Sequence, residues 1–168
     1  MTAPTDPIAA PAADAVTDPA ADPDAPLPPI GYREWITLPA FGLPPLLSKS
    51  DSGAATSALD CENIRMLRGR RVAFTTFTRR GKTPVPHELE ADVIRTASIR
   101  SSNGHLQERV IIATPVRIGP YEFLTEFSLV TRRRLTCRML LGRSAMAGRF
   151  YVDSGNDFLL TPRSRPKS

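Results

Sequence analysis

Cysteine, histidine and tryptophan are scarce in this sequence, whose 168 residues contain only two, two and one of them. The two cysteines, Cys61 and Cys137, are too few for a disulfide framework and indicate a reducing compartment. No stretch approaches the roughly 18 uncharged apolar residues that a membrane-spanning helix needs. The first 30 residues also lack the basic and apolar regions of a secretory signal. These absences predict a single-domain, cytoplasmic protein without a membrane partner.

Ligands for metals and nucleotides are equally sparse. The four His and Cys side chains are those of His87, His105, Cys61 and Cys137, and no two of them have the short spacing of a structural zinc site. His87 and Glu88 begin like a His-Glu-x-x-His metal helix, but the second histidine is missing. No glycine-rich phosphate-binding loop ending in Lys-Ser or Lys-Thr is present. We therefore expect no metal and no other cofactor.

Composition and charge change near residue 30. Residues 1–29 hold nine Ala, eight Pro and five Asp and no Lys or Arg, whereas the remaining chain has 22 basic and 12 acidic side chains. Such a proline-rich segment has too few apolar groups to offset the entropy of ordering, which predicts a disordered arm. An arm that docks on the basic body is the alternative. Residues 161–168 look like a second disordered, basic tail, which leaves a domain over residues 30–160.

Short runs of β-branched and aromatic residues, separated by turn signals, make up this domain. They cover residues 35–38, 72–77, 93–99, 110–116 and 122–130. Asn103-Gly104 lies between two of these runs and is a strong hairpin signal. The one convincing helix is short, over residues 143–147. The pattern predicts an all-β closed barrel with one short C-terminal helix.

The segment Leu46–Leu59 contains the residues best suited to chemistry. An apolar run leads into Asp51, whose carboxylate could act as an acid or base, and Ser52 offers a hydroxyl that can brace the loop. Gly53 allows a backbone amide to approach the carboxylate, and Ala54 keeps the floor of a cleft small. Asp-Ser-Gly alone is also ordinary turn chemistry, so this tripeptide decides nothing by itself.

A second motif, the apolar run 139–141 followed by Gly142-Arg143 and a short helix, completes an ordered set. An Asp-Ser-Gly-Ala loop, a glycine-tipped hairpin and then Leu-Gly-Arg with a helix resembles the retropepsin-like aspartic proteases. Within them, the chain is most similar to the bacterial and archaeal family long labelled an ATP-dependent zinc protease. The likeness spans about residues 30–160, and its motifs are residues 31–35 with 38–39, 51–54, 56–59, 99–104, 108–109, 141–143 and 152–153.

The resemblance implies an aspartic endopeptidase that works as a homodimer, in which Asp51 of each protomer faces its twin. It also implies a flap at Ser101, Ser102, Asn103 and Gly104, and an arginine, Arg143, that supports the active-site loop from behind. Relatives are linked with ATP-grasp ligases that add glutamate tails to proteins. A functional link to such a glutamate ligase and a glutamate-rich peptide or protein substrate are therefore expected for the basic body.

Three features depart from the family pattern, and a fourth competes with this site. Ser52 replaces a usual Thr, Asp60 stands where a His is usual, and the basic run 131–134 replaces an acidic residue followed by Arg. A second Asp-Ser-Gly occurs at Asp153–Gly155, but only 13 residues follow it, too few for a second lobe. We therefore expect a turn at Asp153 and place the catalytic carboxylate at Asp51.

Three basic clusters, over residues 68–71, 79–82 and 132–134, leave other functions open. They are explained by solvated surface charge, by attraction of an acidic substrate or of the acidic arm, or by nucleic-acid binding. Few aromatic residues lie among them, so a nucleic-acid partner is not expected. Two alternatives to proteolysis remain: a non-catalytic dimeric peptide-binding module of the same fold, and a basic β-barrel that binds nucleic acid.

Overall fold

The structure, a computed structural model, describes residues 17–80, 82–100, 106–131 and 137–166, and it is mostly strands. Short 3-10 turns cover Pro19–Ala21 and Pro39–Phe41, and one α-helix, α1, spans Arg143–Met146. The strands are β1 (Pro29–Gly31), β2 (Arg33–Ile36), β3 (Leu46–Asp51), β4 (Ser57–Leu67), β5 (Arg71–Arg80), β6 (Thr83–Arg100), β7 (Leu106–Ile118), β8 (Tyr121–Val130), β9 (Met139–Gly142) and β10 (Tyr151–Asp153).

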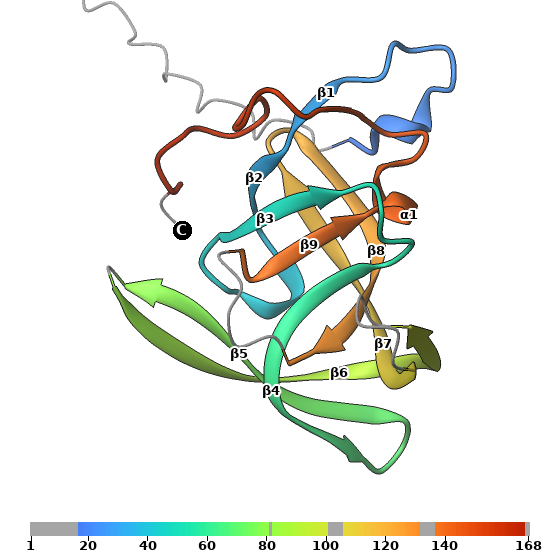
Figure 1. The fold of residues 1–168 in the computed structure, drawn as a ribbon, viewed down its shortest axis with the longest axis vertical. Coiled ribbons are helices and arrows are strands. Elements are labelled where there is room, and N and C mark those ends of the chain that lie inside the picture. Colours follow the sequence, from blue (N-terminus) through green and yellow to red (C-terminus); the bar gives the residue numbers. More distant parts are fainter. Residues whose placement is uncertain (1–16, 81, 101–105, 132–136, 167–168) are drawn as a thin grey trace, which may run out of the picture.

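Eight strands form one sheet in the order β2-β3-β9-β4-β5-β6-β7-β8, and β4 pairs with β8 as well. Every strand from β4 to β8 therefore has a hydrogen-bonded neighbour on both sides. The two remaining strands, β1 and β10, form a separate parallel pair at the end of the molecule where the C-terminal segment crosses (Figure 1). The predicted all-β architecture with one short helix near the C-terminus is confirmed.

The longest pairing is that of β5 with β6, which runs from Arg71 opposite Asp92 to Arg80 opposite Thr83. The β4–β5 and β5–β6 hairpins extend away from the rest of the sheet (Figure 1). The first half of β6 has β5 as its only strand neighbour among the described residues, since β7 pairs with β6 only from Val93 onward. The predicted turn at Asn103-Gly104 lies outside the described residues.

A single large apolar cluster fills the space between the strands. Its most buried members include Ile30, Leu59, Ile112, Phe127 and Met139, none of which exposes any side-chain surface. Over residues 112–118 of β7 and 123–127 of β8, every second residue is buried, as expected of strands with one buried face. Burial of these side chains is the main force that stabilises the sheet.

Both cysteines lie inside the structure. Cys61 exposes none of its surface and Cys137 about a twentieth, and both are free thiols. Burial raises the pKa of Cys61 to about 12 and also raises that of Cys137. Since a thiolate is the reactive form, both side chains act here as small apolar core residues.

The folded body extends beyond the expected limits of residues 30 and 160. Asp18 forms an ion pair with Arg149 at 2.9 Å, and Thr17 donates a backbone hydrogen bond to Pro120. At the other end, Arg165 donates to the carbonyl oxygens of Pro45 and Arg79. Residues 17–29 and 161–166 are therefore attached to the body, because charged side chains and backbone groups at both ends find partners there.

The buried carboxylate of Glu34 fastens the C-terminal segment to β2. This side chain is 2% exposed and accepts five hydrogen bonds. One comes from the amide of Gly31, and the other four come from the amides of residues 159–161 and the Thr161 hydroxyl. A buried carboxylate needs such partners, so this cluster sets the path of the last described residues.

No helix in the described part of the chain is long and apolar enough to cross a membrane.

Candidate functional site

Two strands that are far apart in sequence bring the Asp51 loop and the Gly142-Arg143 segment together. β3 and β9 pair in parallel, and their register places Asp51 opposite Gly142 (Figure 1). β9 also pairs antiparallel with β4, which begins just after the Asp51 loop. The loop is therefore held between the ends of β3 and β9 and the start of β4.

The Asp51 side chain folds back on its own loop. Its Oδ1 atom accepts hydrogen bonds from the amides of Gly53 at 3.1 Å and Ala54 at 3.2 Å. Ala54 also donates to the carbonyl oxygen of Asp51. Asp51 is half-buried, whereas Ser52 and Gly53 are exposed. These bonds fix one carboxylate oxygen, and Oδ2 accepts no hydrogen bond from the described residues.

A close backbone approach beneath the loop requires the glycine at 142. A β-carbon at this position would lie 2.5 Å from the carbonyl carbon of Thr56 and 2.8 Å from the amide nitrogen of Ser57. The amide of Gly142 donates to the buried hydroxyl of Ser57 at 3.0 Å. Ser57 thus joins β4 to β9 directly below the Asp51 loop, a role that the sequence did not reveal.

Arg143 lies behind the loop and contacts its backbone. The Nη1 atom donates to the carbonyl oxygens of Ser52 at 2.8 Å and Gly53 at 3.1 Å. Its own amide donates to Ala54 at 2.9 Å, and the amide of Ser144 donates to Ala55 at 3.1 Å. The first turn of α1 therefore binds the loop through both backbone and side chain.

Asp153, the second aspartate in an Asp-Ser-Gly tripeptide, occupies a simpler turn. It ends β10, which pairs only with β1 among the described strands. Its carboxylate accepts from the Asn156 side-chain amide at 2.9 Å and from the Gly155 amide at 2.8 Å. The Asn156 amide, and then that of Gly155, hold the pKa of Asp153 below its usual value. No arginine among the described residues donates to this turn as Arg143 donates to the Asp51 loop.

The four residues expected to form the flap, Ser101, Ser102, Asn103 and Gly104, lie outside the described residues. Within the described ranges, no three His, Cys, Asp or Glu side chains are grouped so that they could hold a metal ion.

An ion pair near the start of β9 explains one departure from the family pattern. Asp60 is 3% exposed, and its carboxylate pairs with the Arg138 guanidinium. The Asp60 amide also donates to the Arg138 carbonyl oxygen at 2.8 Å, and Arg138 lies over the Phe77 ring. Asp60 stands out in the sequence as a departure from the family pattern, but nothing local in the sequence links it to Arg138, which lies far along the chain.

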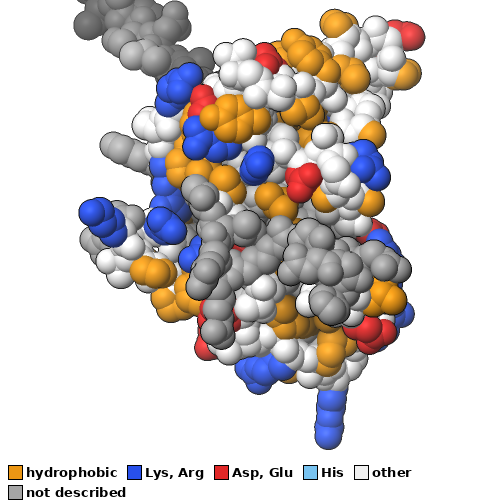
Figure 2. Space-filling model, viewed as in Figure 1, with side chains coloured by type: hydrophobic (Ala, Val, Ile, Leu, Met, Phe, Trp, Pro, Cys, Tyr) orange, Lys and Arg blue, Asp and Glu red, His pale blue; other side chains and the backbone are white. Residues whose placement is uncertain are grey.

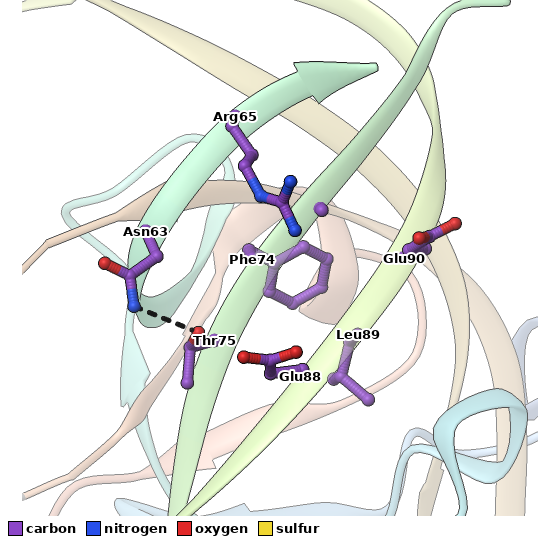
Figure 3. A pocket seen from close by; sticks show the side chains of 8 residues that line it. Asn63, Arg65, Phe74, Thr75, Glu88, Leu89 and Glu90 are labelled. Carbon is purple, nitrogen blue, oxygen red and sulfur yellow. Dashed lines mark hydrogen bonds between the residues drawn. The ribbon is translucent and has the colours of Figure 1, made fainter. Parts of the chain in front are cut away.

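A hollow of about 240 Å³ lies on the β4–β6 hairpins, on other elements than the Asp51 loop. Figure 3 shows Arg65, Phe74 and Glu88 around it, and the Asn63 side chain donating to Thr75 at 3.3 Å. Asn63 has a φ of 53°, and the register of β4 with β5 shifts between Glu62 and Arg65. The hollow is thus a consequence of a β-bulge, which bends the strand and leaves space beside it.

Comparison with known proteins identifies the family. Residues 30–163 match the family described as "Retropepsin-like aspartic endopeptidase RimB". The chain belongs to the RimB-like family. The retropepsin-like character of the fold, expected from the Asp51 and Leu-Gly-Arg motifs, is thereby confirmed.

Relatives with curated names are longer than this chain. It is 34% identical over 134 residues to a "Probable alpha-L-glutamate ligase" of Shewanella halifaxensis, with 78% of this chain and 29% of that protein aligned. A protein of the same name from Desulfotalea psychrophila is 33% identical over 137 residues, with 74% and 27% aligned. This RimB-like chain thus spans less than a third of the length of these relatives.

One solved structure shares the fold. The Legionella pneumophila protein Lpg0085, described as of unknown function, has a TM-score of 0.67 and 24% sequence identity. The match covers 80% of this chain and 98% of that one. At this identity, the likeness supports the RimB-like fold alone.

Proposed function

We propose that this RimB-like chain is an aspartic endopeptidase whose active site forms when two protomers bring their Asp51 side chains together. The single observation that carries the proposal is the fixing of the Asp51 loop. Two amides hold Oδ1, Arg143 binds two loop carbonyls, and Gly142 lies opposite in the register. A loop that served only as a turn, like that at Asp153, would not need an arginine and a second strand to hold it.

One carboxylate alone is too weak an acid–base catalyst for amide hydrolysis near neutral pH. Two carboxylates that lie close together bind protons differently from a single one. At about 3 Å and an effective dielectric constant near 20, two negative charges repel by roughly 5–6 kcal/mol. This repulsion separates their two ionisation steps by about four pH units, so the pair holds a single proton over a wide range. A homodimer with a two-fold axis supplies the second carboxylate from the partner's Asp51.

The chemistry then follows from one shared proton. The ionised carboxylate takes a proton from water, and the water oxygen forms a bond to the scissile carbonyl carbon. The protonated carboxylate gives its proton to the carbonyl oxygen. When the tetrahedral species collapses, the C–N bond breaks and the nitrogen receives a proton from the carboxyl group that had taken one from water. A hydroxyl group of the tetrahedral species re-forms the C=O bond and returns its proton to the other carboxylate. Nothing is oxidised or reduced, and the carboxylate pair returns to its starting state.

Acidic, glutamate-rich peptides are the substrate class that we propose. The chain has a net charge of +5, and residues 30–168 hold 22 basic and 12 acidic side chains, so this part of the chain attracts anions. Figure 2 shows Lys and Arg side chains at the end of the β5–β6 hairpin and along that side of the molecule. The names of the curated relatives favour a functional link with a glutamate ligase, whose product would be a peptide of this kind.

The deciding experiment compares Asp51→Asn with Asp153→Asn on a glutamate-rich peptide and on an unfolded protein. Asp51→Asn should lower the cleavage rate by roughly a thousandfold or more, as expected when a catalytic group is lost. Asp153→Asn is the matched control, because it changes the same residue type in the same tripeptide, and it should cleave like the wild type. Sedimentation should show a dimer for both variants.

The other outcomes would favour a different site, assembly or function. Loss of cleavage in Asp153→Asn with activity kept in Asp51→Asn would refute the site. An active monomer would refute the shared carboxylates. Peptide binding without cleavage in the wild type would instead favour a non-catalytic peptide-binding module. A salt-dependent shift of an oligonucleotide without peptide cleavage would favour a nucleic-acid-binding barrel.

A further inference from the structure

A second cavity, separate from the Asp51 loop, lies where β2, the start of β3 and β5 meet the C-terminal segment. Its volume is about 210 Å³, and its walls include Trp35, Leu47, Phe77, Arg79, Arg138 and Arg165. We refer to it as the arginine–tryptophan pocket. Leu47 and Asp51 are four residues apart on β3, so the pocket is about 13 Å from the Asp51 loop along the strand.

Two hydrogen-bond donors of residues that line this pocket are buried without a partner. These are the indole Nε1 of Trp35 and the guanidinium Nε of Arg138, and neither has an acceptor among the described residues. Buried donors are nearly always satisfied in folded proteins, since each unpaired group carries the full cost of its lost hydration. Two such groups on residues that line one cavity point to an acceptor from outside the described residues.

The pocket also has excess positive charge. Arg138 is paired with Asp60, but neither Arg79 nor Arg165 forms an ion pair with a carboxylate among the described residues. Arg165 instead donates to two backbone carbonyl oxygens and lies 5.8 Å from the centre of the Trp35 ring. These contacts hold the guanidinium in place without neutralising it, so the missing acceptor is an anion.

The remaining wall is apolar and restricts which anion fits. Leu47 and the rings of Trp35 and Phe77 line the cavity, and Arg138 lies 5.4 Å above the Phe77 ring. A phosphate or sulfate would leave this apolar wall without contact. A carboxylate on an apolar stem contacts both the arginine and indole donors and the apolar wall. We propose that the arginine–tryptophan pocket binds the carboxylate of an apolar-stemmed acid, either a small organic acid or the C-terminal residue of a peptide.

The test uses the single tryptophan of the chain as its reporter. Titration with 3-phenylpropionate should shift Trp35 fluorescence and move the one indole N–H resonance in a nitrogen–proton spectrum. The neutral 3-phenylpropanol and inorganic phosphate should each bind at least about tenfold more weakly, because the alcohol lacks the negative charge and phosphate lacks the apolar stem. Equal binding of the alcohol or of phosphate, or no binding of 3-phenylpropionate, would overturn the proposal.

Two peptide ligands then distinguish the sources. Acetyl-Ala-Leu with a free carboxylate should bind more tightly than 3-phenylpropionate if the pocket serves a peptide end, and no more tightly if it serves a small acid. Its C-terminal amide should not bind in either case. Amide binding as tight as that of the free acid would contradict the need for an anion.

Arginine variants locate the site. Arg79→Gln and Arg165→Gln should each weaken binding about tenfold, the effect expected for loss of a charged donor. Arg95→Gln is the control, because Arg95 is exposed and paired with Glu126 on another face of the sheet. If all three variants bind alike, the ligand lies elsewhere and the proposal fails. None of these measurements needs peptide cleavage, so they stand or fall apart from the proposed activity.

Trp35→Phe keeps an aromatic wall and removes only the N–H donor. Calorimetric titration with 3-phenylpropionate should then show weaker binding, while the unfolding temperature stays near that of the wild type because no internal hydrogen bond is lost. Unchanged affinity in this variant would show that the indole donor does not bind the carboxylate.

Discussion

Asp51 and Gly142 face each other across the parallel pair of β3 and β9, so the loop and the start of α1 are assembled by strand register. The amide of Gly142 reaches the Ser57 hydroxyl at the start of β4. The geometry of the candidate site therefore depends on the close packing of three strand ends, and small changes there should be felt in both stability and activity.

The glycine at 142 should be intolerant of even one added carbon. In Gly142→Ala, a methyl group 2.5 Å from the Thr56 carbonyl carbon forces the backbone apart, and we expect a loss of about 1–3 kcal/mol in the free energy of unfolding. Gly155→Ala is the control, since its nearest contact is the Asp153 carboxylate at 3.3 Å. Denaturant titration measures both, and equal values for the two variants would contradict the close approach at 142.

Arg143→Lys should separate activity from stability. Lysine keeps the positive charge, but its ammonium group lies on a flexible stem and lacks the planar guanidinium that fixes Nη1 between the two loop carbonyls, so the Asp51 loop loses a fixed position. We expect kcat to fall by about tenfold while the unfolding midpoint changes little, because Arg143 is exposed. Arg95→Lys serves as the matched control. A kcat equal to that of the wild type in Arg143→Lys would remove the supporting role from this arginine.

Glu34→Gln should destabilise the domain strongly. The buried carboxylate accepts five hydrogen bonds, and an amide nitrogen in place of one oxygen would face N–H donors. We expect a loss of about 2–4 kcal/mol in the free energy of unfolding. Glu122→Gln, which removes a half-exposed partner of Arg117, should cost less than about 1 kcal/mol. Similar losses for the two variants would mean that the Glu34 cluster is not a major source of stability.

Acid should weaken the attachment of the C-terminal segment. A hydrogen bond from Arg33, opposed by burial and helped by the charge of Arg163, holds the pKa of Asp157 below its usual value. A carboxyl group with a lowered folded-state pKa contributes its stability above the unfolded pKa, near 4, and loses it as the pH falls through the folded value. Asp157→Asn should therefore flatten the fall in unfolding free energy below about pH 4.

The measurement is denaturant unfolding at a series of pH values. Asp92→Asn is the control, because Asp92 is 87% exposed and lies 3.8 Å from its partner Arg71. If the unfolding free energy of Asp157→Asn falls with pH as steeply as that of the wild type, the Arg33–Asp157 pair does not contribute to the loss of stability in acid.

The sequence predicted the parts of the fold that depend on local pattern. The runs 72–77, 110–116 and 122–130 fall within β5, β7 and β8, and the predicted helix at 143–147 is α1. The first half of β6 was missed, because Pro84, Pro86 and three acidic residues do not read as a strand. The prolines are tolerated because this half of β6 pairs with a described strand on one side only. A proline whose nitrogen lies on the other side does not need to donate a hydrogen bond.

The candidate site was predictable only through the order of its motifs. Asp51 and Arg143 were named from the sequence, and the register of β3 and β9 explains how they meet. Ser57, Arg138 and the role of Glu34 were missed, since each acts through a partner that is distant along the chain. The catalytic role of Asp51 and the flap at 101–104 remain predictions.

The Glu34 cluster has a consequence for synthesis on the ribosome. Four of its five donors come from residues 159–161, which are synthesised after every strand of the domain. Until they arrive, a nascent chain that has already paired β2 with β3 holds a carboxylate without its donors in the interior. The domain therefore cannot finish folding while its C-terminal residues are still being added, and a translation product that stops before residue 159 should be cleared by proteolysis.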